Sequence, residues 1–285
     1  MRDAGSRAAG TAARYDAPVT NRRSLPLRLG PLAGATVIVT RASGTATALR
    51  RQIAALGGRV IGLPGVALRA VADAALARRA LAAATRADRV VFVSPAAVRF
   101  AWALRPGLRF ARRTVVAAPG PGSARALRRR GVAAPLFPRV RNDSEGILAL
   151  PAFAAVRDLR VALVGAAGGR DLLARELRAR GAVVAAVEVY RREPPRLLPR
   201  HLAALEAAAP PLITLVSSAE ALANLHAGLP GPLFARLAAN ECVASSARIA
   251  ESARRLGLCH VHVGASADPQ ALLAEACTVL ALHRL

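Results

Sequence analysis

Lysine is absent from the sequence, and acidic and aromatic residues are scarce. All 41 basic residues are therefore arginine, and against 17 Asp and Glu they give the 285-residue chain a formal net charge of +24, which should attract anions. Aromatic residues make up only 3% of the chain, however, and the arginines are spread along predicted helices rather than clustered. Because single-strand binders stack bases on aromatic side chains, we expect no nucleic-acid partner. A phosphate or polycarboxylate ligand fits the composition better. If the chain did bind nucleic acid, its affinity for a duplex would depend steeply on salt concentration.

Cysteine is also scarce. Cys242, Cys259 and Cys277 form no CxxC pair, and their odd number argues against a disulfide framework, so we expect a reducing, cytoplasmic location. The five histidines are dispersed along the chain. His260 and His262 could share one face of a strand, but no neighbouring cluster completes a ligand set, so we predict no metal site.

No apolar run reaches the roughly 18 unbroken residues of a membrane-spanning helix, because Arg, Asp or Glu interrupts each one. A hydrophobic content of 54% is nevertheless enough for a large core, so we expect a soluble, monomeric protein with no membrane partner. Residues 1–32 are rich in Arg, Gly, Ala and Pro and lack the apolar centre of a secretory signal. They are expected to form a disordered N-terminal extension.

From Thr36 onward, short β-branched runs alternate with Ala/Leu/Arg segments of helical period. The runs are "TVIVT", "VVFVS", "RVALVG" and "LITLVS", and each precedes such a helical segment. Alternation of this kind predicts an α/β fold with parallel sheets and helices on their faces. The strands read as continuous apolar runs, which is typical of sheets covered on both sides.

Three features recur at an offset of 123 or 124 residues, which predicts a tandem duplication. The matching pairs are Gly57 and Gly181, Ser94 and Ser217, and Ser123 and Ser246. A duplicated α/β unit suggests two similar lobes with a cleft between them, and the repeat alone would put the boundary near residue 159. Ligands of such sheets usually lie beyond the carboxyl ends of the strands.

Serines stand at the predicted strand-to-helix turns: Ser94, Ser123, Ser217, Ser218 and Ser246. A helix N-terminus has unpaired N–H groups and a partial positive charge, so it stabilises an anion without a cationic side chain. Each serine taken alone is better explained as a simple N-cap, which contributes about 1 kcal/mol. Their repetition in so basic a chain favours an anion-binding cleft.

Two glycine-rich turns and three further side chains complete the candidate site. "APGPGSAR" contains Gly122, and "VGAAGGRD" contains Gly169 and Arg170; their glycines would allow a ligand to approach the backbone. Arg170 and Arg41 follow equivalent strands and could bind a carboxylate or be solvated surface residues. Tyr190 ends the apolar run "AVVAAVEVY", where its phenol could pack or donate a hydrogen bond to a leaving oxygen.

No nucleophile, nucleotide-binding or metal-binding motif is visible. The sequence has no GxSxG, no GxxxxGK[ST] and no HExxH. If the chain is an enzyme, we expect no cofactor, and its chemistry would depend on positioning and fixed dipoles.

Taken in order, these motifs resemble the uroporphyrinogen-III synthase family. The resemblance covers roughly residues 35–280 and is carried by "VVFVSPAAVRF", "GPGSARALRRRG", "NDSEGILAL", "VGAAGGRDLLARELRARGAVVAAVEVYRR", "ITLVSSAEAL" and "ASADPQALLAEA". It implies a cofactor-independent cytoplasmic lyase of tetrapyrrole and haem synthesis. Its substrate would be hydroxymethylbilane, a linear tetrapyrrole with eight carboxylates, which loses water and is closed with inversion of ring D to uroporphyrinogen III.

The resemblance also implies how the chain divides. Lobe 1 would comprise 33–67 and 193–285 and lobe 2 would comprise 68–192, each a flavodoxin-like parallel sheet flanked by helices. Two extended segments, "LPGVALRA" and "VEVYRREPP", would cross between them. This division replaces the boundary near residue 159.

Ser94, Ser123, Ser217 and Tyr190 match family positions that line the cleft, and Tyr190 is the family's candidate for assisting departure of the hydroxyl. The sequence departs from the family pattern at Ala42, Ala96, Val164 and the turn 244–248. These departures support an alternative, a non-catalytic two-lobed binding protein for an organic anion such as a tetrapyrrole.

Overall fold

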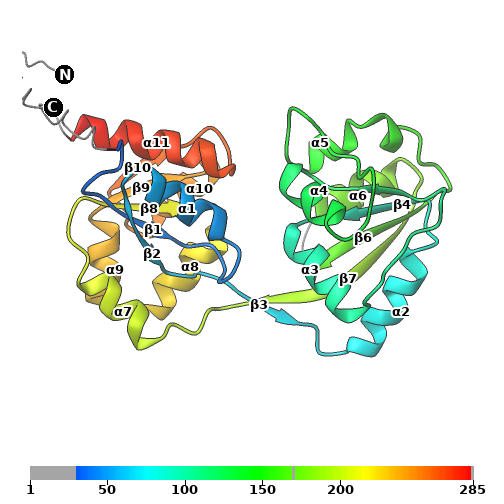
Figure 1. Cartoon of the computed structure of the whole chain (residues 1–285), viewed down its shortest axis with the longest axis horizontal. Helices are drawn as coiled ribbons and strands as arrows, with labels where there is room; N and C mark the ends of the chain where they lie inside the picture. Colours follow the sequence, from blue (N-terminus) through cyan, green and yellow to red (C-terminus); the bar gives the residue numbers. More distant parts are fainter. Residues whose placement is uncertain (1–29, 169–170, 284–285) are drawn as a thin grey trace, which may run out of the picture.

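The computed structural model describes residues 30–168 and 171–283, which form two α/β lobes side by side (Figure 1). Most of the N-terminal extension predicted for residues 1–32 lies outside the described residues. Its last part does not fit that prediction, because Leu32 is fully buried in the core and its N–H donates to the carbonyl oxygen of Leu56. Residues 30–32 therefore belong to the first lobe.

Lobe 1 is built on a five-stranded parallel sheet with the order β10-β9-β8-β1-β2. Its strands are β1 (Thr36–Val39), β2 (Arg59–Gly62), β8 (Leu212–Val216), β9 (Glu241–Ala244) and β10 (His260–Val263). One face is covered by α7 (Pro199–Glu206), α8 (Ala219–Gly228), α9 (Gly231–Ala238) and α10 (Ala247–Arg255). The other face is covered by α1 (Thr47–Ala55) and α11 (Pro269–Leu282).

Lobe 2 is built on a second five-stranded sheet with the order β3-β7-β6-β4-β5. Its strands are β3 (Ala67–Ala70), β4 (Arg89–Phe92), β5 (Val115–Ala117), β6 (Arg160–Ala166) and β7 (Val183–Glu193), and only β3 runs antiparallel to its neighbour. One face packs on α2 (Ala74–Ala84), α3 (Pro95–Leu104) and α4 (Pro121–Arg128). The other packs on α5 (Ser144–Leu148), a 3-10 turn (Pro151–Phe153) and α6 (Asp171–Ala179).

Coverage on both faces explains the composition of the central strands. All residues of β1, β8 and β9 are buried, so alternation between apolar and polar side chains would place polar groups in a core. The predicted α/β class with two helix-flanked, mainly parallel sheets is confirmed. Within the described ranges, every helix is too short or too polar to cross a membrane.

The two sheets share a strand order that crosses the halves of the sequence. In lobe 1, β1 lies between β2 and β8, with β9 outside β8; in lobe 2, β6 lies in the same way between β7 and β4, with β5 outside β4. Each lobe therefore combines strands from the first and the second half of the chain. A boundary near residue 159 is wrong, because β6 pairs directly with β4.

The lobes are joined where β3 and β7 pair as an antiparallel ribbon, with Ala67 opposite Glu193 and Ala70 opposite Tyr190 (Figure 1). The first crossing leaves lobe 1 at Gly65, whose carbonyl oxygen accepts a hydrogen bond from Nδ2 of Asn224 on α8 (2.9 Å). A side chain on Gly65 would collide with the backbone of α8, so glycine allows the close contact here. The domain boundaries predicted at 67/68 and 192/193 fall within this ribbon and remain predictions.

Candidate active site

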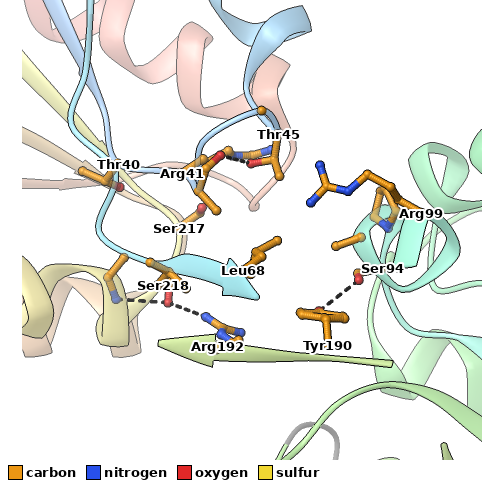
Figure 2. Close-up of a pocket in the computed structure, with 16 residues that line it drawn as sticks. Thr40, Arg41, Thr45, Leu68, Ser94, Arg99, Tyr190, Arg192, Ser217 and Ser218 are labelled. Carbon is orange, nitrogen blue, oxygen red and sulfur yellow. Dashed lines mark hydrogen bonds between the residues drawn. The ribbon is translucent and has the colours of Figure 1, made fainter. Parts of the chain in front are cut away.

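A cavity of about 520 Å³ lies between the lobes, beside the ribbon that joins them (Figure 2). The turns that follow β1 and β8 line it from lobe 1, and the turn that follows β4 lines it from lobe 2. The wall is completed by the crossing strands β3 and β7. The lining residues are Thr40, Arg41, Ala42, Gly44, Thr45, Val66, Leu68, Ser94, Pro95, Ala96, Arg99, Tyr190, Arg192, Ser217, Ser218 and Ala221.

Ser94 presents the N-terminus of α3 to this cavity. Its backbone is extended and its Oγ accepts a hydrogen bond from the N–H of Ala97 (3.0 Å), which is an N-cap. Pro95 occupies the first helical position, where a missing N–H costs nothing. The serine and proline that end this buried strand thus start a helix whose positive end faces the cavity.

Tyr190 is on β7, and its side chain lies beside Ser94. Tyr190 is 6% exposed, and its ring stacks on Phe100 of α3, with centroids 5.2 Å apart and an interplanar angle of 17°. Its hydroxyl oxygen is 3.2 Å from Oγ of Ser94, and either group can donate (Figure 2). The ring is therefore fixed by packing, and the phenol lies at the cavity wall next to a helix N-terminus.

Ser218 plays the capping role in lobe 1. Its Oγ accepts from the N–H of Ala221 (3.3 Å) at the start of α8 and also from Nη2 of Arg192 (3.3 Å). Arg192 also forms an ion pair with Glu220 (2.6 Å), in the first turn of the same helix. Arg192 on the crossing strand is thereby tied to lobe 1, while its guanidinium lines the cavity.

Three arginines line the cavity, Arg41, Arg99 and Arg192, and none of the described residues that line it is acidic. Arg41 donates from Nη2 to the carbonyl oxygen of Ala267 (2.7 Å); burial lowers the pKa of its guanidinium and the nearby Asp268 opposes that effect. Arg41 nevertheless stays charged, because arginine starts from a very high pKa. The residues that line the cavity are therefore basic, although Glu220 and Asp268 lie close to two of the three arginines.

Arg99 reaches from lobe 2 toward lobe 1 across the cavity (Figure 2). Its guanidinium lies over the ring of Phe100, 4.9 Å from the centroid. Its Nη1 lies 3.7 Å from the position that a Cβ would take on Gly44, in the turn before α1. An anion between the lobes would therefore meet cations from both sides.

The structure brings five of the predicted site residues together in this cavity: Arg41, Ser94, Tyr190, Ser217 and Ser218. Ser218 rather than Ser217 caps α8, so the true repeat partner of Ser94 is one residue further along than the sequence comparison placed it.

Gly122, Ser123 and Ser246 do not line the cavity. Ser123 is the third residue of α4 and is 5% exposed, while the cap position of that helix is Gly120. Ser246 does cap a helix, α10, and accepts from the N–H of Ile249 (3.4 Å), but it follows the more distant strand β9. Gly169 and Arg170 lie outside the described residues.

Arg99 and Arg192 are cavity residues that the sequence analysis did not assign. Arg192 follows Tyr190 by two residues, and because side chains on a strand alternate, both fall on the same face. That spacing could have identified it. Arg99 carries no comparable signal, because its position depends on how the two lobes sit against each other.

No group of His, Cys, Asp and Glu in the described part of the chain is arranged to hold a metal ion. The features above define a two-lobed α/β protein with a basic cleft at the carboxyl ends of its strands. Arginines and helix N-termini are the groups that proteins use to bind organic anions.

The family described as uroporphyrinogen-III synthase HemD matches residues 47–274. This chain therefore belongs to the uroporphyrinogen-III synthase family, as the order of its motifs predicts.

Two solved structures share the fold. A variant of uroporphyrinogen III synthase from the extremely thermophilic bacterium Thermus thermophilus is 20% identical with a TM-score of 0.54, and the match covers 86% of this chain and 98% of that one. Uroporphyrinogen-III synthetase from Helicobacter pylori is 11% identical with a TM-score of 0.55, and the match covers 86% of this chain and 99% of that one. Identities this low show a common fold.

Proposed function

We propose that this chain is a uroporphyrinogen-III synthase that converts hydroxymethylbilane to uroporphyrinogen III in the cavity between its lobes. The family match over residues 47–274 supports the activity. The observation that carries the location is the cavity itself, where three arginines and two serine-capped helix N-termini surround Tyr190. The family match gives no support to the non-catalytic alternative, which depends only on the departures from the family pattern named above.

The substrate would be held by its carboxylates. Arg41 and Arg192 lie on the lobe 1 side of the cavity and Arg99 lies on the lobe 2 side. One linear tetrapyrrole can therefore contact both walls at once. The N-termini of α3 and α8 add partial positive charge without needing a further cation. Contacts to both walls bend the linear tetrapyrrole and bring its two ends together, which reduces the entropic barrier to ring closure.

Tyr190 would assist the first step. The C–O bond of the hydroxymethyl group breaks while the pyrrole nitrogen supplies electrons and gives up its N–H proton. The hydroxide and one proton leave as water, and the neutral azafulvene remains. The phenol donates a hydrogen bond to the departing oxygen while Ser94 and Phe100 hold it in place. Ring D is then inverted through a spiro intermediate, and the arginine-bound arms keep the chain folded until it closes.

The test is product isomer analysis. Hydroxymethylbilane closes without an enzyme to uroporphyrinogen I, so the purified chain should turn the product almost wholly to isomer III. After the products are oxidised to porphyrins, the two isomers are separated and the amount of each is measured. A product that is all isomer I, at the uncatalysed rate, would refute the proposal and favour the non-catalytic binder. Monomeric state and cytoplasmic location remain predictions.

A further inference from the structure

A second cavity, of about 510 Å³, lies on lobe 1 next to the inter-lobe cleft. It is enclosed by the turn after β1, the end of β2, and the first turns of α1 and α7. Arg41, Ala42 and Gly44 line both cavities, so only this turn separates them. A ligand in the cleft can therefore extend a flexible arm around it.

The second cavity is basic and has no countercharge. Arg50 of α1 and Arg200 of α7 line it beside Arg41, and none of its described lining residues is acidic. Neither the Arg50 nor the Arg200 side chain has a hydrogen bond or ion pair within residues 30–168 and 171–283. Arg191 and Arg192 on β7, by comparison, both form ion pairs with glutamates. Two guanidinium groups here remain available to a ligand.

His201 adds a third donor. Its Nδ1 accepts a hydrogen bond from the N–H of Leu198 (3.1 Å), so the neutral ring carries its proton on Nε2. Burial, and secondarily the charge of Arg200, lower the pKa of this imidazole. The negative charge of a bound anion would favour the protonated imidazole and raise this pKa, so the pKa of His201 would report whether an anion is bound.

We propose that this second cavity is a carboxylate-binding subsite that holds one acidic arm of the tetrapyrrole through Arg50, Arg200 and Nε2 of His201. The inference rests on the proposed function, since it assigns part of the same substrate. The reason for the proposal is the number of arginines compared with the number of substrate carboxylates. The cleft has three arginines for a substrate with eight carboxylates, and the adjoining cavity contributes two more.

The first experiment is kinetic. Arg50→Gln and Arg200→Gln should each raise KM for hydroxymethylbilane about three- to tenfold while kcat changes less than twofold, because the arm is far from the reacting carbon. Arg51→Gln is the matched control: it lies on the same helix, loses the same charge and does not line the cavity. If all three variants have the same KM, the cavity does not hold the substrate and the proposal is wrong.

The second experiment measures binding without turnover. Glutarate, a dicarboxylate probe, should raise the pKa of His201 followed by NMR, with the resonance assigned through His201→Gln. The rise should be lost in the Arg50→Gln, Arg200→Gln double variant and kept in Arg51→Gln. A rise with inorganic phosphate but not with glutarate would assign the cavity to a phosphorylated ligand and overturn the proposal, as would no rise with either probe. If the wild type made no isomer III, the proposed function would fail, while glutarate binding would still support a carboxylate site.

Discussion

Tyr190→Phe separates the chemical role of the phenol from its packing role. The substitution removes one hydroxyl and leaves a ring of the same shape stacked on Phe100 at 5.2 Å. Stability should fall by only about 0.5–1.5 kcal/mol, because one hydrogen bond to Ser94 is lost from an otherwise intact core. The variant should therefore fold, and any larger effect must come from the reaction.

The expected loss of turnover follows from the charge that develops on the leaving oxygen. A hydrogen bond to a charged group contributes about 1.5–3 kcal/mol, and each 1.36 kcal/mol corresponds to a tenfold change in rate. If Tyr190 makes that bond only as the C–O bond breaks, kcat should fall roughly tenfold to a hundredfold with little change in KM. The assay is the initial rate of isomer III formation, with the uncatalysed rate of isomer I subtracted.

Two further variants test the explanation. Ser94→Ala should lower kcat less than about threefold, because the amides at the start of α3 and the Tyr190 hydroxyl both remain. Phe100→Leu keeps the hydroxyl but removes the stack, so it should lower stability and leave the phenol less firmly held.

An unchanged kcat in Tyr190→Phe would take the phenol out of the mechanism. A near-total loss in Ser94→Ala would mean that the serine hydroxyl is itself essential.

The remaining predictions concern charge, packing and thiol reactivity. Glu220→Gln releases Arg192 from its ion pair at the cavity rim, so KM for the substrate should fall about two- to threefold in steady-state assays. A higher KM would instead show that the ion pair orients Arg192 for binding. Gly65→Ala should lower Tm by several degrees, because its new methyl group collides with the α8 backbone and overpacking costs about 1–3 kcal/mol, whereas Gly231→Ala meets open space and should change little. Burial, and then a neighbouring carboxylate, raise the pKa of Cys242 to about 12, so a thiol reagent at pH 8 should label it only after unfolding in guanidinium, and rapid native labelling would contradict this.

Much of the fold was predictable because its signals are local. Continuous apolar runs between helical segments identify doubly covered strands, and β1, β8 and β9 are indeed buried along their whole length. The cap at Ser94 could also be predicted from the sequence, because serine followed by proline is typical of a helix N-terminus.

The division into lobes was less accessible from the residues. The repeat correctly relates β1 to β6, but spacing along a chain does not show which strands pair, and here each half contributes to both sheets. Only the resemblance to a known family replaced the boundary near residue 159.

The site could be predicted only in part for the same reason. The sequence comparison placed the lobe 1 cap at Ser217 when Ser218 occupies it, because two adjacent serines follow β8 and the apolar run before them does not show which one starts the helix. Ser123 looked like a cap, but the helix starts earlier, at a glycine that makes no side-chain cap bond. Arg99 reaches the cavity only through the packing of one lobe against the other.

The ribbon between the lobes has a mechanical consequence. Tyr190 is held on lobe 2 by Phe100 and Ser94, whereas Arg192, two residues further along the strand, is held on lobe 1 by Glu220 and Ser218. If the cleft widens or narrows, the part of β7 between these two anchor points would have to deform. The phenol and the guanidinium would then shift relative to each other as the ribbon bends, so the residues at the connection between the lobes also line the cavity.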